Sequence, residues 1–333
     1  MEPGAEQPVV ETVHGSRRPG ARALQAVGLV VGLALLAWAV RLALGPENRE
    51  ALERMRHAPA SLVLALAGLT VLTVVNNGVM FWWTLRPLRR VPAGETVGVN
   101  AIATFLSLLP FKLGLIVRSL VHVRRHGVSW SQLASWYAAF AGLTLGSLVL
   151  IGVASVAPGL TNTARFAAAA GMLVVLGAGA VVAGRVVAPW RIFSKPFFAY
   201  AFAIARDPAT VAGHVALRAI DVLIFGLRFY IAAKIAGVML SAGSSLQLGG
   251  AYLFLTAVAP AGSLGFTELG TAKAGGLLGL DTRTVALLAL VTTAAQGVVS
   301  GLMAVAAWVW IRPHALWKRR EEPSPAPASS VER

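Results

Sequence analysis

The chain has 333 residues, of which 56% are hydrophobic and only 13% are charged, whereas soluble domains usually contain about 25% charged residues. This composition excludes a cytosolic globular fold, a disordered chain and a coiled coil, and it indicates an α-helical membrane protein with several spans. The 29 basic and 14 acidic residues give a net charge of +15, which an anionic membrane surface explains without a nucleic-acid partner.

Apolar segments occupy residues 23–311, which we predict to form one membrane domain. Residues 1–22 are expected to be a disordered arm, and residues 312–333 a basic and then Pro/Ser-rich disordered tail. A short interfacial helix is predicted at 196–205. Six segments are long and apolar enough to span about 30 Å as helices: 24–44, 59–85, 129–156, 166–184, 209–236 and 284–311.

Two further apolar segments are interrupted in the middle. Residues 96–124 contain Pro110 and Gly114, and residues 246–279 contain Pro260, Gly262 and Gly265. Because proline lacks an amide hydrogen and clashes with the preceding turn, we expect both helices to break there. One interpretation is two kinked spanning helices, which would make eight spans. The other is two re-entrant helical hairpins, each returning to its starting side of the membrane.

The distribution of basic residues favours the hairpins. With both termini cytoplasmic and both broken segments re-entrant, 19 of the 29 basic residues fall on the inner side, as the positive-inside rule requires. The halves 23–156 and 160–311 then have opposite orientations. This inverted repeat with broken helices is typical of secondary transporters. The inner segments 1–22, 86–95, 112–128, 185–208 and 312–333 carry three, three, four, four and five basic residues.

Four ionisable residues lie within the predicted span 209–236, namely His214, Arg218, Asp221 and Arg228. At 100° per residue they form one stripe about 80° wide on the helix. Asp221 can neutralise one arginine and leave a net positive charge. The stripe is either a buried ion pair that holds helices together or a cationic lining for an anionic headgroup, which arginine binds with a planar fork of donors.

The broken segments carry further candidates. Lys112 and Arg118 follow the first break, where a new helix N-terminus would favour an anion, although Lys112 could equally extend to the inner surface. Glu268 follows the second break. It could pair with Arg218 or Arg228, or it could cap the helix that begins there.

At both breaks the sequence resembles the membrane region of lysylphosphatidylglycerol synthases and their free-standing flippase-like relatives. Residues 109–118, LPFKLGLIVR, are similar to the family's apolar-Pro-Phe-basic-x-Gly-Glu-x-x-Arg stretch, and residues 260–268, PAGSLGFTE, to its Pro-x-x-Gly-x-Leu-Gly-x-x-Glu. Leu115 replaces the usual acid, and the family's Glu-Arg-x-x-Asp pattern is absent from 136–146. The resemblance covers about residues 24–311 and does not include the aminoacyl-transferase domain of true synthases.

The resemblance implies that the protein moves a lipid or lipid-linked anionic substrate between the leaflets of the cytoplasmic membrane. The alternative is a non-transporting subunit or scaffold of a lipid or cell-envelope biosynthetic enzyme. We expect no enzyme activity, cofactor or metal site, because no catalytic motif is found and the chain has no cysteine. Expected partners are membrane lipids with an anionic or polyprenyl-linked headgroup, and either a second copy of the chain or a partner biosynthetic enzyme.

Overall fold

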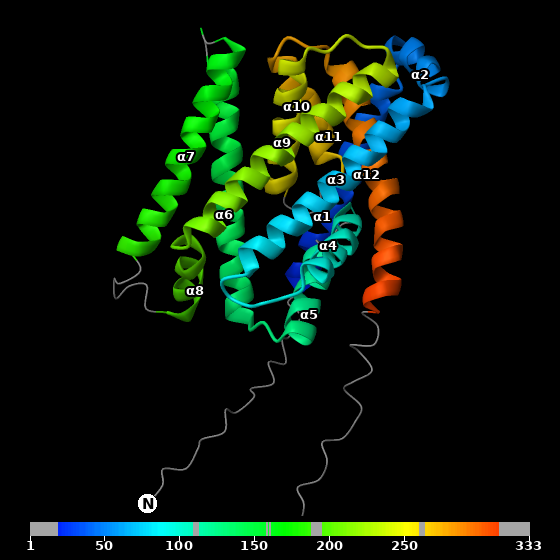
Figure 1. Cartoon of the computed structure of the whole chain (residues 1–333). Coiled ribbons are helices and arrows are strands. Elements are labelled where there is room, and N and C mark those ends of the chain that lie inside the picture. The colour runs from blue at the N-terminus through cyan, green and yellow to red at the C-terminus, as the bar shows by residue number, and fades with distance from the viewer. Residues whose placement is uncertain are drawn as a thin grey trace, which may run out of the picture.

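The computed structural model describes residues 19–108, 113–157, 159, 161–187, 195–259 and 264–312. Every regular element in these ranges is a helix, and the chain is an all-α integral membrane protein (Figure 1). The elements in chain order are α1 (Pro19–Ala43), the 3₁₀ helix η1 (Pro46–Asn48), α2 (Arg49–Arg56), α3 (Ala60–Leu85), α4 (Ala93–Leu108), α5 (Leu113–His126), α6 (Trp130–Val156), α7 (Asn162–Val186), α8 (Pro196–Ala205), α9 (Pro208–Ala236), α10 (Ala242–Val258), α11 (Phe266–Leu277) and α12 (Thr282–Ile311).

Four helices within the described ranges are long and apolar enough to cross a membrane, and they are α3, α6, α7 and α12. All four coincide with spans predicted from the sequence. The other two predicted spans correspond to α1, with 25 residues, and α9, with 29 residues. At about 1.5 Å per residue both are long enough to cross the bilayer, and the charged stripe within α9 lowers its hydropathy.

The outward face of the helices is strongly apolar. On α7, at one side of the molecule in Figure 1, Val174 and Val175 are about 70% exposed, and on α12 Leu302 and Val305 are exposed to a similar extent. Apolar surface of this extent is unfavourable in water and is matched by the hydrocarbon of a bilayer.

The first broken segment forms a helical hairpin of α4 and α5, called here the first hairpin. Its helices run antiparallel, because Glu95 contacts the end of α5, Asn100 contacts Arg118, and Ala103 lies against Gly114. A Cβ atom at Gly114 would stand 2.0 Å from the carbonyl oxygen of Ala103. Glycine is therefore required at this position for the two helices to approach so closely.

The second broken segment forms a second hairpin, in which α10 packs against α11. α11 begins after Gly265, whose φ of +80° lies in the region that favours glycine. Gly270 of α11 lies against Leu255 of α10. The predicted break is therefore present, with its glycine at the start of the new helix.

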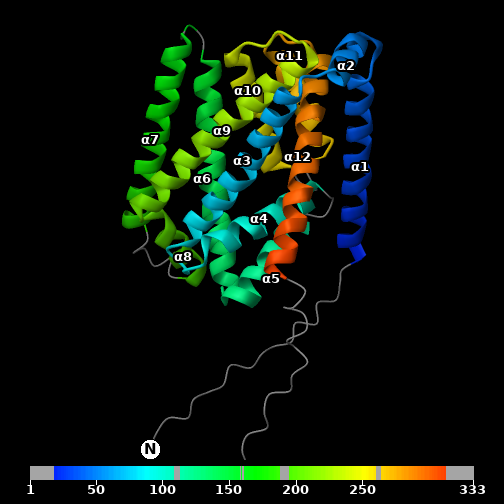
Figure 2. The ribbon, with the colours of Figure 1, turned by 45° about the vertical axis from the view of Figure 1, so that its right-hand side comes forward.

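The two hairpins approach α12 from opposite ends, as Figures 1 and 2 show. The first hairpin contacts the end of α12 through Arg125 and Ile311, and its tip at Leu108 reaches Gly297. The second contacts the beginning of α12, and Glu268 near its tip binds Thr293. Both tips thus reach the middle of α12. In a bilayer that α12 crosses, Leu108 and Glu268 would then lie near mid-depth.

The described chain begins and ends at the same end of the molecule. The start of α1 and the end of α12 lie at the end of the molecule that also holds α5 and α8, and α2 lies at the opposite end (Figure 2). α8 has the predicted bounds of 196–205 and packs against α6, α7 and α9. α1 begins at Pro19, a few residues before the expected start of the membrane domain.

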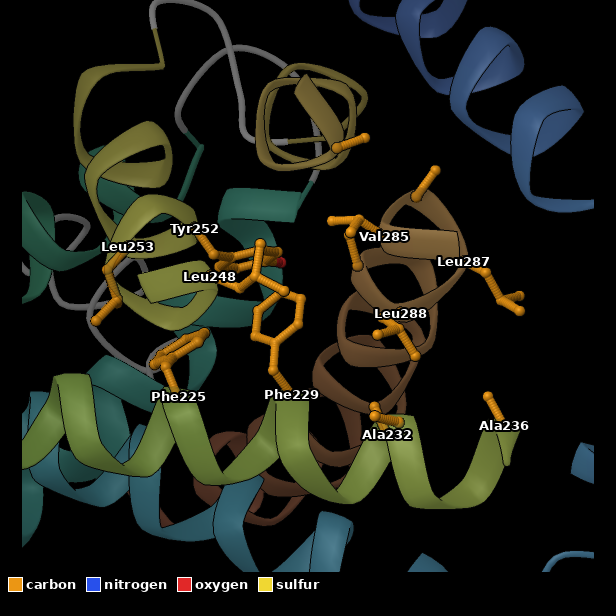
Figure 3. Close-up of a cluster of buried hydrophobic side chains, with 14 of the residues drawn as sticks. Phe225, Phe229, Ala232, Ala236, Leu248, Tyr252, Leu253, Val285, Leu287 and Leu288 are labelled. Carbon is orange, nitrogen blue, oxygen red and sulfur yellow. The ribbon is translucent and has the colours of Figure 1, made fainter. Parts of the chain in front are cut away.

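A large apolar cluster forms where α9, α10 and α12 meet (Figure 3). Phe225 and Phe229 of α9 point toward Tyr252 of α10, and Leu288 of α12 lies beside them. These side chains are buried. The cluster fixes α9 in place, and the polar stripe of the same helix adjoins it, because Arg228 stands over the ring of Phe225.

Candidate functional site

The predicted stripe on α9 lies inside the protein. His214, Arg218, Asp221 and Arg228 are all buried, with at most 4% of any residue exposed. α9 packs against α3, α6 and α12 as well as α10. The stripe therefore faces other helices and not lipid.

Arg218 and Asp221 form an ion pair within this stripe. Nη1 of Arg218 donates a hydrogen bond of 2.6 Å to Oδ2 of Asp221, and Asn77 of α3 donates to the same oxygen at 3.4 Å. Nη2 of Arg218 donates to the hydroxyl of Thr144 on α6 at 3.0 Å, and that hydroxyl lies 3.2 Å from Nε2 of His214. The pair thus links α9 with α3 and α6.

Arg228 has no carboxylate within ion-pair distance among the described residues. Its Nη2 donates to the carbonyl of Thr292 on α12 at 2.9 Å, and its Nη1 lies 3.5 Å from the hydroxyl of Thr73 on α3. The guanidinium also stands over the ring of Phe225 at 4.4 Å. These partners are neutral, so within the described ranges the charge of Arg228 has no counter-charge in direct contact and is balanced only at longer range, by Asp221.

Arg118 of the first hairpin is a second buried cation with neutral partners. Its Nη2 donates to Oδ1 of Asn100 at 2.6 Å, and its guanidinium lies 3.7 Å from the ring centroid of Phe81. The rings of Phe81 and Phe140 are stacked, with their centroids 3.9 Å apart. The Cζ atom of Arg218 lies 5.9 Å from the centroid of the Phe140 ring. The structure therefore brings Arg118 and Arg218 to one aromatic pair.

Glu268 caps α11. Its Oε2 accepts a hydrogen bond of 2.6 Å from the amide of Gly265, and its Oε1 accepts one of 2.5 Å from the hydroxyl of Thr293. The Tyr252 hydroxyl lies 2.8 Å from the same threonine oxygen. The sequence left two roles open for Glu268, an ion pair with an arginine of α9 and a helix cap, and the structure shows the helix cap. Within the described ranges Glu268 forms no ion pair with either arginine of α9.

The remaining predicted residues lie at the breaks. Gly114 and Gly265 are described above. Pro110, Lys112, Pro260 and Gly262 lie outside the described residues. Leu115, at the place of the usual family acid, has an exposed side chain.

Sequence reasoning missed a group of ionisable residues at the base of the first hairpin. Oε2 of Glu95 lies 2.8 Å from Nε2 of His126, and Arg125 donates to Oε1 at 2.8 Å. Nδ1 of His126 lies 3.1 Å from Nδ1 of His122. Burial raises the pKa of Glu95, but hydrogen bonds from His126 and Arg125 outweigh it and hold this pKa below its usual range. The spacing of four between the histidines was the signal in the sequence.

Many polar atoms around these residues are buried and have no hydrogen-bond partner in the part of the chain that the structure describes. They come from both hairpins and from α9 and α12. Native interiors leave few such atoms, and those that occur usually bind water or a ligand. The interior can therefore bind a polar ligand. The atoms include Nε of Arg118, Arg218 and Arg228, Nδ1 of His214, Oδ1 of Asp221, the hydroxyls of Thr267, Thr271 and Thr292, and Oε1 of Gln296.

A family model described as the lysylphosphatidylglycerol synthase TM region matches residues 25–304. The chain belongs to this family. The match includes both hairpins, all of α9 and most of α12. Neither the curated proteins nor the solved structures compared with the chain gave a match.

Membership of this family links the protein to the biosynthesis or translocation of membrane lipids. The residues that the family motifs suggested and the buried stripe of α9 converge on one interior. Arg118 comes from the first motif, Glu268 from the second, and Arg218 lies between them in the sequence. The candidate site is this cationic interior between the two hairpins and α9.

Proposed function

We propose that the protein translocates a lipid or lipid-linked anionic substrate between the leaflets of the cytoplasmic membrane. Arg118, Arg218 and Arg228 bind the headgroup, and the sequence adds Lys112, which lies outside the described residues, as a fourth candidate. Asp221 and Glu268 adjust the local charge. The protein contributes no bond-making chemistry in this proposal.

The single observation that carries the proposal is the uncompensated positive charge of the interior. Among the residues that the structure describes, Arg218 alone of the three buried arginines has a carboxylate partner, and the Nε atom of each arginine has no partner there. A buried charge without a counter-charge is strongly unfavourable in a dry apolar medium. An anionic headgroup would supply both the missing charge and the missing acceptors, because guanidinium binds phosphate through parallel hydrogen bonds.

The position of the hairpin tips supports a path through the membrane. Both tips reach the middle of α12 from opposite ends. Broken helices that meet at mid-depth are the usual site of substrate binding in transporters built from inverted repeats. We infer that both hairpins are re-entrant and that both termini are cytoplasmic, in agreement with the excess of basic residues on that side.

The proposal is tested in proteoliposomes that contain a trace of fluorescent phosphatidylglycerol or phosphatidylcholine. A membrane-impermeant reductant destroys the fluorescence of the outer leaflet only. With the purified protein we expect the anionic probe to be lost almost completely and the zwitterionic probe more slowly. Loss of both probes only to the extent seen in empty liposomes would contradict translocation of these lipids.

The second candidate is a non-transporting scaffold, which the hydrogen bond from Arg228 to the Thr292 carbonyl favours because it joins α9 to α12. In a scaffold this arginine stabilises the fold. Arg228→Met would then lower the amount of folded protein, and neither the wild type nor the folded variant would move lipid. Under the transport proposal the folded fraction transports more slowly.

A further inference from the structure

Three side chains connect the base of the first hairpin with its buried interior. Glu95 is about one-fifth exposed, His126 is less than one-tenth exposed, and His122 is fully buried. The contacts are 2.8 Å from Oε2 of Glu95 to Nε2 of His126 and 3.1 Å from Nδ1 of His126 to Nδ1 of His122. The three side chains thus form a continuous chain of polar contacts from the aqueous end to the buried interior.

Each of these contacts requires one proton between its two atoms. When Nε2 of a neutral His126 donates to the Glu95 carboxylate, its Nδ1 must accept the Nδ1 proton of His122. Nε2 of His122 then carries a lone pair. That atom is buried and has no hydrogen-bond partner within the described ranges, so it is an open proton acceptor inside the protein.

His122 lies one helical turn from Arg118 on the same face of α5. A proton on His122 would therefore be repelled by the positive charge of Arg118. Protonation of His122 is unfavourable mainly because the ring is buried, and the positive charge of Arg118 adds a repulsion. An anion bound to Arg118 removes this repulsion and favours the proton. The ionisable and charged groups that face the two histidines are Glu95 from α4, Arg118 and Arg125 from α5, Tyr137 from α6, and Arg89 from the segment after α3.

We propose that His122 is a proton-binding site coupled to the anion at Arg118 and reached through Glu95 and His126. This inference rests on the proposed function, because it assigns to the same site a proton that accompanies the anionic headgroup. The energy for directed lipid movement would then come from a difference in pH across the membrane.

The proton transfer balances along the chain of contacts. A proton binds Nε2 of His122, and the Nδ1 proton of His122 passes to Nδ1 of His126. The Nε2 proton of His126 passes to the Glu95 carboxylate and then to water. One proton enters, one leaves, and no other bond changes.

Entry from the aqueous end starts from the other pair of tautomers, with protons on Nδ1 of His126 and Nε2 of His122. A proton from water binds the Glu95 carboxylate and passes to Nε2 of His126, and the Nδ1 proton of His126 passes to Nδ1 of His122. His122 is then protonated at both nitrogens.

The test uses the ring of Trp136, which lies 5.2 Å from the ring of His122 in an edge-on arrangement. Protonated imidazole quenches indole fluorescence, so tryptophan emission reports the charge of His122. The full chain is placed in nanodiscs of phosphatidylcholine, and emission is titrated with pH. We expect a reversible quench on acidification that is absent in both His122→Gln and Trp136→Phe. An unchanged titration in His122→Gln would overturn the proposal.

Coupling is measured by repeating the titration in nanodiscs that contain phosphatidylglycerol. The midpoint should move to higher pH by about one unit more in the wild type than in Arg118→Gln, because an opposite charge at this range typically has that effect. Arg118→Gln also corrects for the lower pH at an anionic surface. Arg118→Met, of similar volume, replaces it if the glutamine variant does not fold. Equal shifts with and without Arg118 would contradict the coupling.

The route is tested by a rapid drop in pH. The quench should form about tenfold more slowly in His126→Gln than in the wild type, and an equal rate would exclude the route through His126.

The fluorescence titration and the lipid assay give independent results. If His122 titrates and responds to phosphatidylglycerol but no lipid moves, the proton site stands and the transport proposal falls. If lipid moves and His122 does not titrate, the transport proposal stands and the proton site falls.

Discussion

Arg218 and Asp221 lie three residues apart on α9 and form an ion pair of 2.6 Å in which both side chains are buried. The pair accounts for one of the two arginines in the stripe. Arg228, nearly three turns further along α9, has neutral partners. The stripe predicted from helical periodicity therefore has a neutral part and a cationic part.

Asp221→Asn is expected to destabilise the protein by about 3 kcal/mol, because removal of one partner leaves a buried charge uncompensated. The measurement is thermal unfolding in detergent. The matched control is the double variant Arg218→Met with Asp221→Leu, which replaces both charges by apolar side chains and should recover most of the stability. A single variant as stable as the wild type would show that the Arg218 charge is compensated elsewhere.

Gly114→Ala is expected to separate the two helices of the first hairpin, since its Cβ would stand 2.0 Å from the Ala103 carbonyl oxygen. Overpacking of this kind typically costs about 1–3 kcal/mol. Gly142→Ala is the control, because a Cβ at Gly142 in α6 meets nothing within 4 Å. The unfolding temperature should fall for the first variant only. A similar change for both would mean that the hairpin tolerates a wider spacing.

The topology can be tested by cysteine labelling, because the chain has no cysteine. Arg90→Cys and Arg124→Cys flank the first hairpin, and Met239→Cys and Leu277→Cys flank the second; all four positions are exposed. An impermeant maleimide should label the first two from the cytoplasmic side and the last two from the outside. Labelling of the two flanks of one hairpin from opposite sides would mean that this segment spans the membrane.

The helix α12 begins at a cap that should respond to pH. The Asp281 carboxylate accepts hydrogen bonds from the hydroxyl and amide of Thr284, and these bonds hold the pKa of Asp281 below its usual range. The cap therefore contributes its stability above the usual carboxyl pKa and loses it as the pH falls through the lowered value. Asp281→Ala should cost about 1 kcal/mol at neutral pH and less in acid. A difference in unfolding temperature that stays constant from neutral to acidic pH would contradict this role.

Helical periodicity and the proline and glycine positions predicted much of the fold. The residues of the α9 stripe share a buried face because their spacing is an intrinsic property of a helix. Gly114 and Gly265 marked the hairpins because close helix contact and a positive φ both favour glycine. These signals are local, so one sequence is enough to detect them.

The partners of the charged residues could not be predicted in the same way. Asn100 binds Arg118, Thr144 binds Arg218, and Thr292 binds Arg228. Each contact joins different helices, and its formation depends on how those helices pack. Glu268 illustrates the consequence. A local capping contact and a distant ion pair were both compatible with its position, and tertiary structure decided between them.

The central claim is that buried arginines bind an anionic headgroup during translocation, and the leaflet assay with Arg118→Gln tests it most directly. The control is Arg56→Gln on α2, where the side chain is 77% exposed. Loss of a charge-assisted hydrogen bond should slow movement of fluorescent phosphatidylglycerol roughly tenfold or more, whereas Arg56→Gln should match the wild type. If folded Arg118→Gln moves this lipid at the wild-type rate, the claim is contradicted.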